Sequence, residues 1–338
     1  MTLPTISTKL TQVLNCRYPI LCAGMGGPAR SELAAAVSNA GGFGQMGMVR
    51  ESPELIAREI NEVRRRTNRP FAVNLVPSVT QPDLLRAELD VCLAAHVPAM
   101  CFFWDVVPEV VAEAKRAGCL VLYQVGNAAA AFQAEAAGAD VIIAQGVEAG
   151  GHVHGHLPLA ALLGQLAGRL KVPLVASGGI ADGRSMAAAL SLGADGVHCG
   201  TAFLVAEESF AHDYHKQRIV DAKAEDTVHT DLFAINWPIN SPVRVLKNSV
   251  VAAAGDKLWG HDPDAMPREV IAHDDGVPMH KWDTNSPLRT TTGELEAMAL
   301  YSGTGCGQIT AVRPAAEILG DMMRDAVATL NCLAARVG

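Results

Sequence analysis

A histidine at the end of a glycine-rich turn is the side chain of this sequence best placed to do chemistry. His152 closes the run 148–152 (Glu-Ala-Gly-Gly-His), which follows the apolar run 140–143. Glycines let the backbone approach a ligand closely, so this turn presents His152 where a buried strand ends. An imidazole with a pKa of about 6.5 transfers protons at neutral pH. We therefore predict that His152 is a catalytic residue.

His154 and His156 follow at alternate positions, so a metal site must be weighed. A metal-dependent hydrolase built on a barrel would use His152, His154 and His156 with further carboxylate, lysine or histidine ligands from other strand ends. The predicted strand ends carry mostly Gly, Met, Asn, Gln and Ser, which are poor ligands for such a metal. We predict no metal site here, and the metal hydrolase stays open as an alternative of another class.

Two further glycine turns could hold an anion. Ser177-Gly178-Gly179 and Gly200-Thr201 each follow a short apolar run. Backbone N–H groups in such turns bind phosphate, and the helix predicted to begin near Gly183 would add its positive end. Tight connections between strand and helix are the other explanation for these glycines. Two adjacent turns, each with a hydroxyl residue, favour a phosphate site.

The elements that must position these residues alternate regularly through the first two hundred residues. Apolar runs predict eight strands at 19–23, 42–46, 71–75, 99–103, 119–124, 141–144, 173–176 and 196–199. Between them, amphipathic or alanine-rich stretches predict helices, for example at 31–39, 53–66, 82–95, 108–117, 128–137 and 183–192. Eight alternating units predict a (β/α)8 TIM barrel, whose active site lies at the carboxyl ends of the strands. An open doubly wound sheet is the structural alternative.

The alternation stops after Phe203. Residues 207–311 are polar and irregular, and a helical pattern resumes at 314–336. We predict a barrel formed by residues 1–206 and 312–338. Residues 207–311 would form a smaller, mainly helical substrate-capping domain, inserted after strand eight as the roof of a pocket.

Composition excludes several classes of protein. A formal charge of −8 and an aromatic content of 5% argue against nucleic-acid binding. The eight cysteines form no CxxC pair, the N-terminal stretch has no signal-peptide pattern, and no apolar run reaches about 20 residues. These features predict a cytoplasmic protein with a small-molecule substrate and with neither nucleic acid nor membrane as a partner.

Several motifs together resemble the nitronate monooxygenase family (formerly 2-nitropropane dioxygenases) and the related flavin-dependent enoyl-acyl-carrier-protein reductases and NADH:quinone reductases. The similar segments are 19–25, 40–44, 70–75, 145–152, 176–183 and 192–201. The resemblance implies an FMN-binding barrel with a helical second domain and a catalytic role for His152. It also implies FMN contacts from Gly24, Met25, Asn74, Gln124, Gly151, Ser177, Gly179, Gly200 and Thr201, the last four near the phosphate, where Gly178 also lies.

The implied reaction is oxidation of alkyl nitronates by O2 to carbonyl compounds and nitrite. The alternative on the same scaffold is an NAD(P)H-dependent flavin reductase of the enoyl-acyl-carrier-protein or quinone reductase type. A homodimer is a candidate assembly. The chain departs from the family pattern at Ala202, where an arginine is usual, and at Thr304, where a glutamine is usual. Trp237 and Tyr301 could supply pocket walls or belong to a core.

Overall fold

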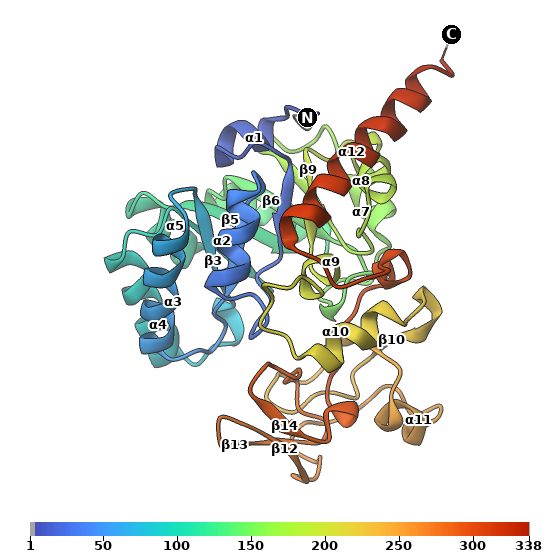
Figure 1. Ribbon diagram of the computed structural model, residues 1–338. Coiled ribbons are helices and arrows are strands. Elements are labelled where there is room, and N and C mark those ends of the chain that lie inside the picture. The colour runs from blue at the N-terminus through green and yellow to red at the C-terminus, as the bar shows by residue number, and fades with distance from the viewer. Residues whose placement is uncertain (1–3, 338) are drawn as a thin grey trace.

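Eight parallel strands surrounded by helices form the larger part of the computed structural model, which describes residues 4–337 (Figure 1). Residues 1–3, part of the stretch in which the sequence predicts no signal peptide, and residue 338 lie outside the described residues. The barrel strands are β1 (Ile20–Cys22), β2 (Gly44–Gly47), β3 (Phe71–Leu75), β4 (Ala99–Phe103), β5 (Leu120–Val125), β6 (Val141–Gln145), β8 (Leu174–Ser177) and β9 (Gly196–Cys199). Each overlaps a strand predicted from the sequence.

The barrel closes between its first two strands. Neighbouring strands follow the order β1-β9-β8-β6-β5-β4-β3-β2, and a parallel bridge joins Leu21 to Phe43. The amide of Cys22 donates to the carbonyl oxygen of Phe43 at 3.0 Å, and the amide of Phe43 donates to that of Ile20 at 2.9 Å. This closure confirms the (β/α)8 barrel and excludes the open doubly wound sheet.

Helices cover the outside of the barrel and its amino-terminal end. They are α1 (Lys9–Leu14), α2 (Ser31–Asn39), α3 (Pro53–Arg66), α4 (Pro82–Ala94), α5 (Pro108–Arg116), α6 (Ala128–Ala137), α7 (Leu159–Leu166), α8 (Gly183–Ser191), α9 (Thr201–Leu204) and α12 (Ala315–Ala334), with the 3-10 turn η1 (Pro77–Val79). The Ser52 hydroxyl caps α3 by accepting from the Leu55 amide, and a proline occupies the first turn. No helix in residues 4–337 has the length and apolar character that a membrane crossing needs.

The barrel interior changes from apolar to polar along its axis. Its buried cluster includes Leu122, Ile143 and Val175, with Leu10 and Leu14 of α1 packed against them. Side chains two residues farther along a strand point to the same face. On six of the eight strands the next inward position toward the carboxyl end is polar, namely Gln45, Asn74, Gln124, Gln145, Ser177 and His198, while β1 and β4 present Ala23 and Phe103 there. The interior thus ends in polar groups at the face where a barrel carries its active site.

The segment after strand eight adds two small sheets to its helices. Residues 207–311 contain α10 (Asp213–Val220), η2 (Ala224–Asp226), β10 (Thr227–Thr230), β11 (Val243–Leu246), α11 (Ser249–Ala254), β12 (Val270–Asp274), β13 (Val277–His280), β14 (Thr291–Gly293), η3 (Leu295–Ala297) and η4 (Thr304–Gln308). One antiparallel sheet has the order β13-β12-β14, and the other, β10-β11-β7, includes β7 (Gly151–His152). The sequence analysis predicts a mainly helical segment and misses these strands. Strands this short and polar show no clear alternation of apolar and polar residues, and they form only with their partners.

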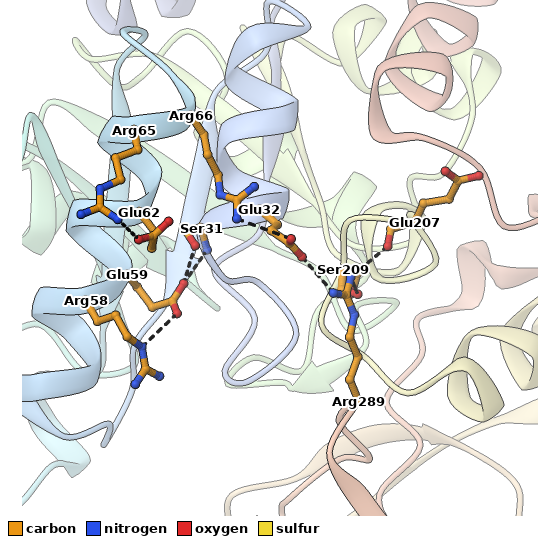
Figure 2. A network of polar contacts seen from close by, with 10 residues as sticks. All are labelled: Ser31, Glu32, Arg58, Glu59, Glu62, Arg65, Arg66, Glu207, Ser209 and Arg289. Carbon is orange, nitrogen blue, oxygen red and sulfur yellow. Dashed lines mark hydrogen bonds and ion pairs between the residues drawn. The ribbon is translucent and has the colours of Figure 1, made fainter.

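An arginine of the inserted segment joins it to the barrel helices (Figure 2). The Arg289 guanidinium donates to Glu32 Oε2 of α2 at 2.9 Å and to the carbonyl oxygens of Glu207 and Ser209 at 3.0 and 2.9 Å. Arg66 of α3 lies 3.6 Å from the other carboxylate oxygen of Glu32. In Figure 1 the inserted segment lies at the end of the barrel opposite α1. It therefore covers the end where the strands present their carboxyl termini.

Candidate functional site

A cavity of about 1030 Å³ lies at the carboxyl ends of the barrel strands, beneath the inserted segment. Its walls include residues from β3, β5, β6, β8 and β9 and from residues 236–305. All eleven residues that the sequence predicts for the site line this cavity: Gly24, Met25, Asn74, Gln124, Gly151, His152, Ser177, Gly178, Gly179, Gly200 and Thr201. The structure therefore brings them together, while their contacts with a ligand stay a prediction.

The turn after β8 offers free backbone donors to the cavity. Gly178 and Gly179 have φ angles of +117° and +70°, which glycine adopts readily and other residues rarely do. Neither amide, nor that of Thr201 on the neighbouring strand end, donates to a backbone carbonyl elsewhere in residues 4–337. Backbone N–H groups left free at adjacent strand ends can bind an anion.

The helix end that the sequence assigns to this anion site lies elsewhere. Asp182 caps α8 by accepting from the Ser185 amide at 2.7 Å. A side chain on Gly183 would collide with Asp325 and Ala326 of α12, so that helix covers the start of α8. Neither Asp182 nor Gly183 lines the cavity. The expected contribution from the positive end of α8 is therefore wrong, because a carboxylate and a neighbouring helix occupy that end.

A glutamine fixes the strand that carries the candidate catalytic histidine. The Gln145 amide nitrogen donates to the His152 carbonyl oxygen at 2.9 Å, and Gln145 Oε1 accepts from the His154 amide at 3.2 Å. On the other side, His152 pairs with Val243 of β11. Gly151, with φ of +77°, faces open space where a Cβ would meet nothing within 4 Å. The barrel and the inserted segment thus hold the His152 backbone jointly.

The glutamate in the same motif has a structural part. Both carboxylate oxygens of Glu148 accept from the Leu159 amide, at 3.1 and 3.0 Å, so Glu148 caps α7. The Glu148 carbonyl oxygen accepts from the Thr304 amide at 3.0 Å. Glu148 therefore shapes the turn before His152 and links it to η4.

Three aromatic rings surround the His152 imidazole. Trp237 stacks on it with ring centroids 3.5 Å apart and 26° between the planes. Trp104 lies edge-on with its centroid 6.0 Å away, and Tyr301 lies tilted by 49° with its centroid 6.2 Å away. On Trp237 lies the guanidinium of Arg50, 4.9 Å from the indole centroid. Arg50 also donates to the carbonyl oxygens of Val79, at 2.7 Å, and Asn236.

These surroundings keep His152 neutral. Both ring nitrogens are buried and have no hydrogen-bond partner in the described part of the chain. Burial, with a smaller contribution from the positive charge of Arg50, lowers the pKa of His152 to about 3, although the backbone of Ser241 opposes the shift. At neutral pH the imidazole therefore carries no positive charge, can form hydrogen bonds through both ring nitrogens, and is a weaker base than the pKa of about 6.5 expected from the sequence would make it.

The other two histidines of the motif do not join His152 in a metal site. His154 Nε2 lies 3.2 Å from Asp105 Oδ1, and its ring packs on Trp104 with centroids 4.5 Å apart. Burial lowers the pKa of His154 although Asp105 opposes the shift. His156 is exposed. Within residues 4–337, no three His, Cys, Asp or Glu side chains are grouped so that they could hold a metal ion, which leaves the metal-hydrolase alternative without a ligand set.

Among the cavity residues that the sequence prediction omits or leaves undecided, four have side chains that bear on His152 or on the glycine turns. Arg50 follows β2, and Trp237 and Tyr301 come from the inserted segment. His198 lies on β9, and its Nδ1 is 3.0 Å from Ser177 Oγ. Only His198 had a usable signal, since it stands two residues before Gly200 and so shares its face of the strand. The inserted segment has no periodicity from which the direction of Trp237 could be read.

The structure shows where the two residues that depart from the family pattern, Ala202 and Thr304, lie. Ala202 is 1% exposed and belongs to the apolar cluster between barrel and helices. Thr304 lies in η4, where its amide contacts Glu148, and it is not among the cavity residues. The neighbouring Gly303 amide donates to Thr201 Oγ1 at 2.9 Å. This segment therefore closes the cavity largely through backbone contacts.

The fold and the cavity define a (β/α)8-barrel enzyme with its site at the carboxyl ends of the strands. The chain belongs to the nitronate monooxygenase family, whose family model matches residues 7–86 and 78–325. Members of this family are flavin-dependent oxidoreductases, and the chain is an oxidoreductase of that class.

Individual relatives agree with this assignment. The curated protein "Probable nitronate monooxygenase" of Staphylococcus saprophyticus is 33% identical over 335 residues, covering 83% of this chain and 92% of the relative. Among solved structures, FabK from Thermotoga maritima has a TM-score of 0.83 and 30% identity, covering 98% of this chain and 100% of that one. Nitroalkane oxidase from Streptomyces ansochromogenes has a TM-score of 0.78 and 29% identity, covering 96% and 100%.

Proposed function

We propose that the protein uses FMN to oxidise alkyl nitronates with O2, giving carbonyl compounds and nitrite. The observation that carries this proposal is the neutral imidazole of His152, whose ring nitrogens have no hydrogen-bond partner in the described residues, in the wall of a cavity where two other turns offer free anion-binding amides. The similarity to a nitroalkane oxidase along nearly the whole chain supports the same substrate class.

FMN fits the residues present. The free amides of Gly178, Gly179 and Thr201 suit a phosphate, with Ser177 and Gly200 beside them. Gly24, Met25, Asn74, Gln124 and Gly151 would line the remainder of the cofactor's site, the two side-chain amides offering hydrogen bonds to a polar ring edge. The positions of these residues in one cavity support FMN over a flavin without phosphate.

When bound, the flavin supplies the electron transfer from substrate to O2. His152 would lie beside the nitro group of the substrate, and because its pKa of about 3 makes it a weak base, its part would be to form a hydrogen bond there and not to remove a proton from carbon. With the nitronate anion, the neutral imidazole would orient the nitro group without adding charge. Trp237, Trp104 and Tyr301 would keep water away from this end of the cavity. Residues 207–311 would act as the substrate-capping domain.

Cavity volume favours a second candidate, an NAD(P)H-dependent flavin reductase of the enoyl-acyl-carrier-protein or quinone reductase type. Sites for one drug-sized ligand span about 300 to 1,000 Å³, and this cavity has about 1030 Å³. Space beyond one cofactor would admit a second sizeable molecule. The similarity to FabK is consistent with this candidate. A cytoplasmic location and a homodimer stay predictions.

The visible spectrum of the purified holoprotein under anaerobic conditions separates these candidates. Nitronate oxidation predicts fast bleaching of the flavin by ethyl or propyl nitronate, slow bleaching by NADH, and nitrite release once O2 is admitted. Fast bleaching by NADH with no response to nitronate would reject the first proposal in favour of the reductase. A colourless protein with stoichiometric zinc would reject both.

A further inference from the structure

A second histidine faces the same cavity. His198 lies near the carboxyl end of β9, is 4% exposed and lines the cavity wall. It stands in parallel register with Ser177 of β8, which is 6% exposed. His198 comes two residues before Gly200, and Ser177 comes directly before Gly178. The pair therefore lies beside both turns of the proposed phosphate site.

One ring nitrogen of His198 is held and the other is free. Nδ1 lies 3.0 Å from Ser177 Oγ, whereas Nε2 is buried and has no hydrogen-bond partner in the described chain. A buried polar atom without a partner is costly and uncommon in folded proteins. A ligand group entering the cavity can supply the missing partner.

The state of the ring suits a polar or anionic ligand. Burial lowers the pKa of His198 to about 3, so the imidazole is neutral and carries one N–H. If the Ser177 hydroxyl donates to Nδ1, the proton resides on Nε2, and Nε2 then donates to the ligand. Ser177 is thus a positioning residue for the His198 tautomer.

We propose that His198, oriented by Ser177, binds the ribityl phosphate tail of FMN through Nε2. This inference rests on the proposed cofactor and extends it. Ala202, which follows the Gly200-Thr201 turn, is buried in the apolar cluster and offers no charged group to the phosphate. The histidine would supply a side-chain donor at this end of the site, where the glycine turns supply backbone donors.

Two amide substitutions at position 198 separate the contribution of the Nε2 atom from that of the Nδ1 atom. The amide nitrogen of His198→Gln reaches about as far as imidazole Nε2, whereas that of His198→Asn reaches only about as far as Nδ1. Binding of FMN and of lumiflavin, which has the flavin ring but no tail, is measured on the apoprotein by quenching of flavin fluorescence. Loss of a hydrogen bond to a charged group corresponds to roughly a tenfold to hundredfold weaker affinity.

We expect His198→Asn to weaken FMN binding by this factor and to leave lumiflavin binding unchanged, while His198→Gln retains most FMN affinity. Ser177→Ala should add little to the effect of His198→Asn, since the two residues act as one unit. His229→Asn is the matched control, because His229 also has a buried, unpartnered Nε2 but lies on β10 outside the cavity.

Three outcomes overturn the inference. The subsite alone is rejected if wild type binds FMN and His198→Asn binds it equally well, or if FMN and lumiflavin weaken together. A wild-type protein that binds no FMN rejects both the subsite and the proposed cofactor. Thermal unfolding of each apo variant shows whether it folds. If His198→Asn does not fold, the ratio of FMN affinity to lumiflavin affinity in His198→Gln is compared with that of wild type.

Discussion

The imidazole of His152 and the indole of Trp237 stack face to face, with centroids 3.5 Å apart, although one residue belongs to the barrel and the other to the inserted segment. His152 follows the sixth barrel strand, and Trp237 belongs to the inserted segment. The contact covers one face of the candidate catalytic ring. The inserted segment therefore sets the environment of His152 as well as roofing the cavity.

Removing the indole should make His152 more basic. Trp237→Ala admits water to the imidazole, and hydration raises its pKa toward the ordinary value of about 6.5. We expect the acid limb of the kcat/KM profile for nitronate to move to higher pH, while Trp237→Phe, which keeps a ring, moves it less. Trp259→Ala is the control, since Trp259 is 54% exposed and lies outside the cavity. Identical profiles for wild type and Trp237→Ala would contradict the shielding.

The charge of Arg50 should act on the same pKa. Arg50→Met keeps much of the side-chain volume and removes the positive charge that helps to lower the pKa of His152. The acid limb of kcat/KM should again move to higher pH. Arg65→Met, at an exposed position on α3, is the control. An acid limb that moves to lower pH in Arg50→Met would show that the charge acts in the opposite sense.

Buried histidines, among them His198 and His215, should make the fold sensitive to mild acid. Burial lowers the pKa of His198 to about 3 and that of His215 to about 4, below the value of about 6.5 in an unfolded chain. Below pH 6.5 the unfolded chain therefore binds more protons, and the free energy of unfolding falls as pH decreases toward 4. Each histidine contributes a slope of about 1.4 kcal/mol per pH unit within this window and nothing above it.

Denaturant unfolding of the apoprotein between pH 4.5 and 7.5 measures this slope, an interval set by the two pKa values and the unfolded value. His198→Gln and His215→Gln should each flatten it, whereas His96→Gln, at an exposed position, should leave it unchanged. Because burial also lowers the pKa values of His152 and His229, part of the slope should remain in each variant, and a slope that neither substitution flattens would assign the acid sensitivity to other groups.

Gln145 should matter through the backbone it holds. Gln145→Leu leaves the His152 carbonyl and the His154 amide without their partner, at a cost of about 1 to 3 kcal/mol in stability. Because His152 is then less well positioned, turnover should fall by roughly tenfold to hundredfold. Thermal unfolding and steady-state kinetics check both effects, with Gln133→Leu on the exposed face of α6 as the control. Unchanged turnover would mean that β11 alone positions His152.

The sequence predicts the barrel well because its signals are local. Proline and serine at the start of α3, and short apolar runs that end in glycine, mark elements without reference to distant residues. The gathering of the eleven site residues follows from topology, since the carboxyl ends of parallel strands meet at one face.

What the sequence does not predict depends on contacts between distant segments. β7 is a strand only because β11 pairs with it, and Trp237 faces His152 only because the inserted segment folds over the barrel. The low pKa of His152 likewise requires the neighbours that bury it. A free histidine in a glycine turn would be expected to titrate near neutrality, so this part of the site follows from tertiary packing.

Turnover of propyl nitronate by His152→Ala tests the central claim most directly. Flavin content from the visible spectrum and nitrite release are measured on the same preparation, beside wild type. We predict that His152→Ala retains its FMN and loses most nitrite production, since the glycine turns bind the cofactor and His152 acts on the substrate. A variant that retains its FMN and releases nitrite at the wild-type rate would contradict the catalytic assignment of His152.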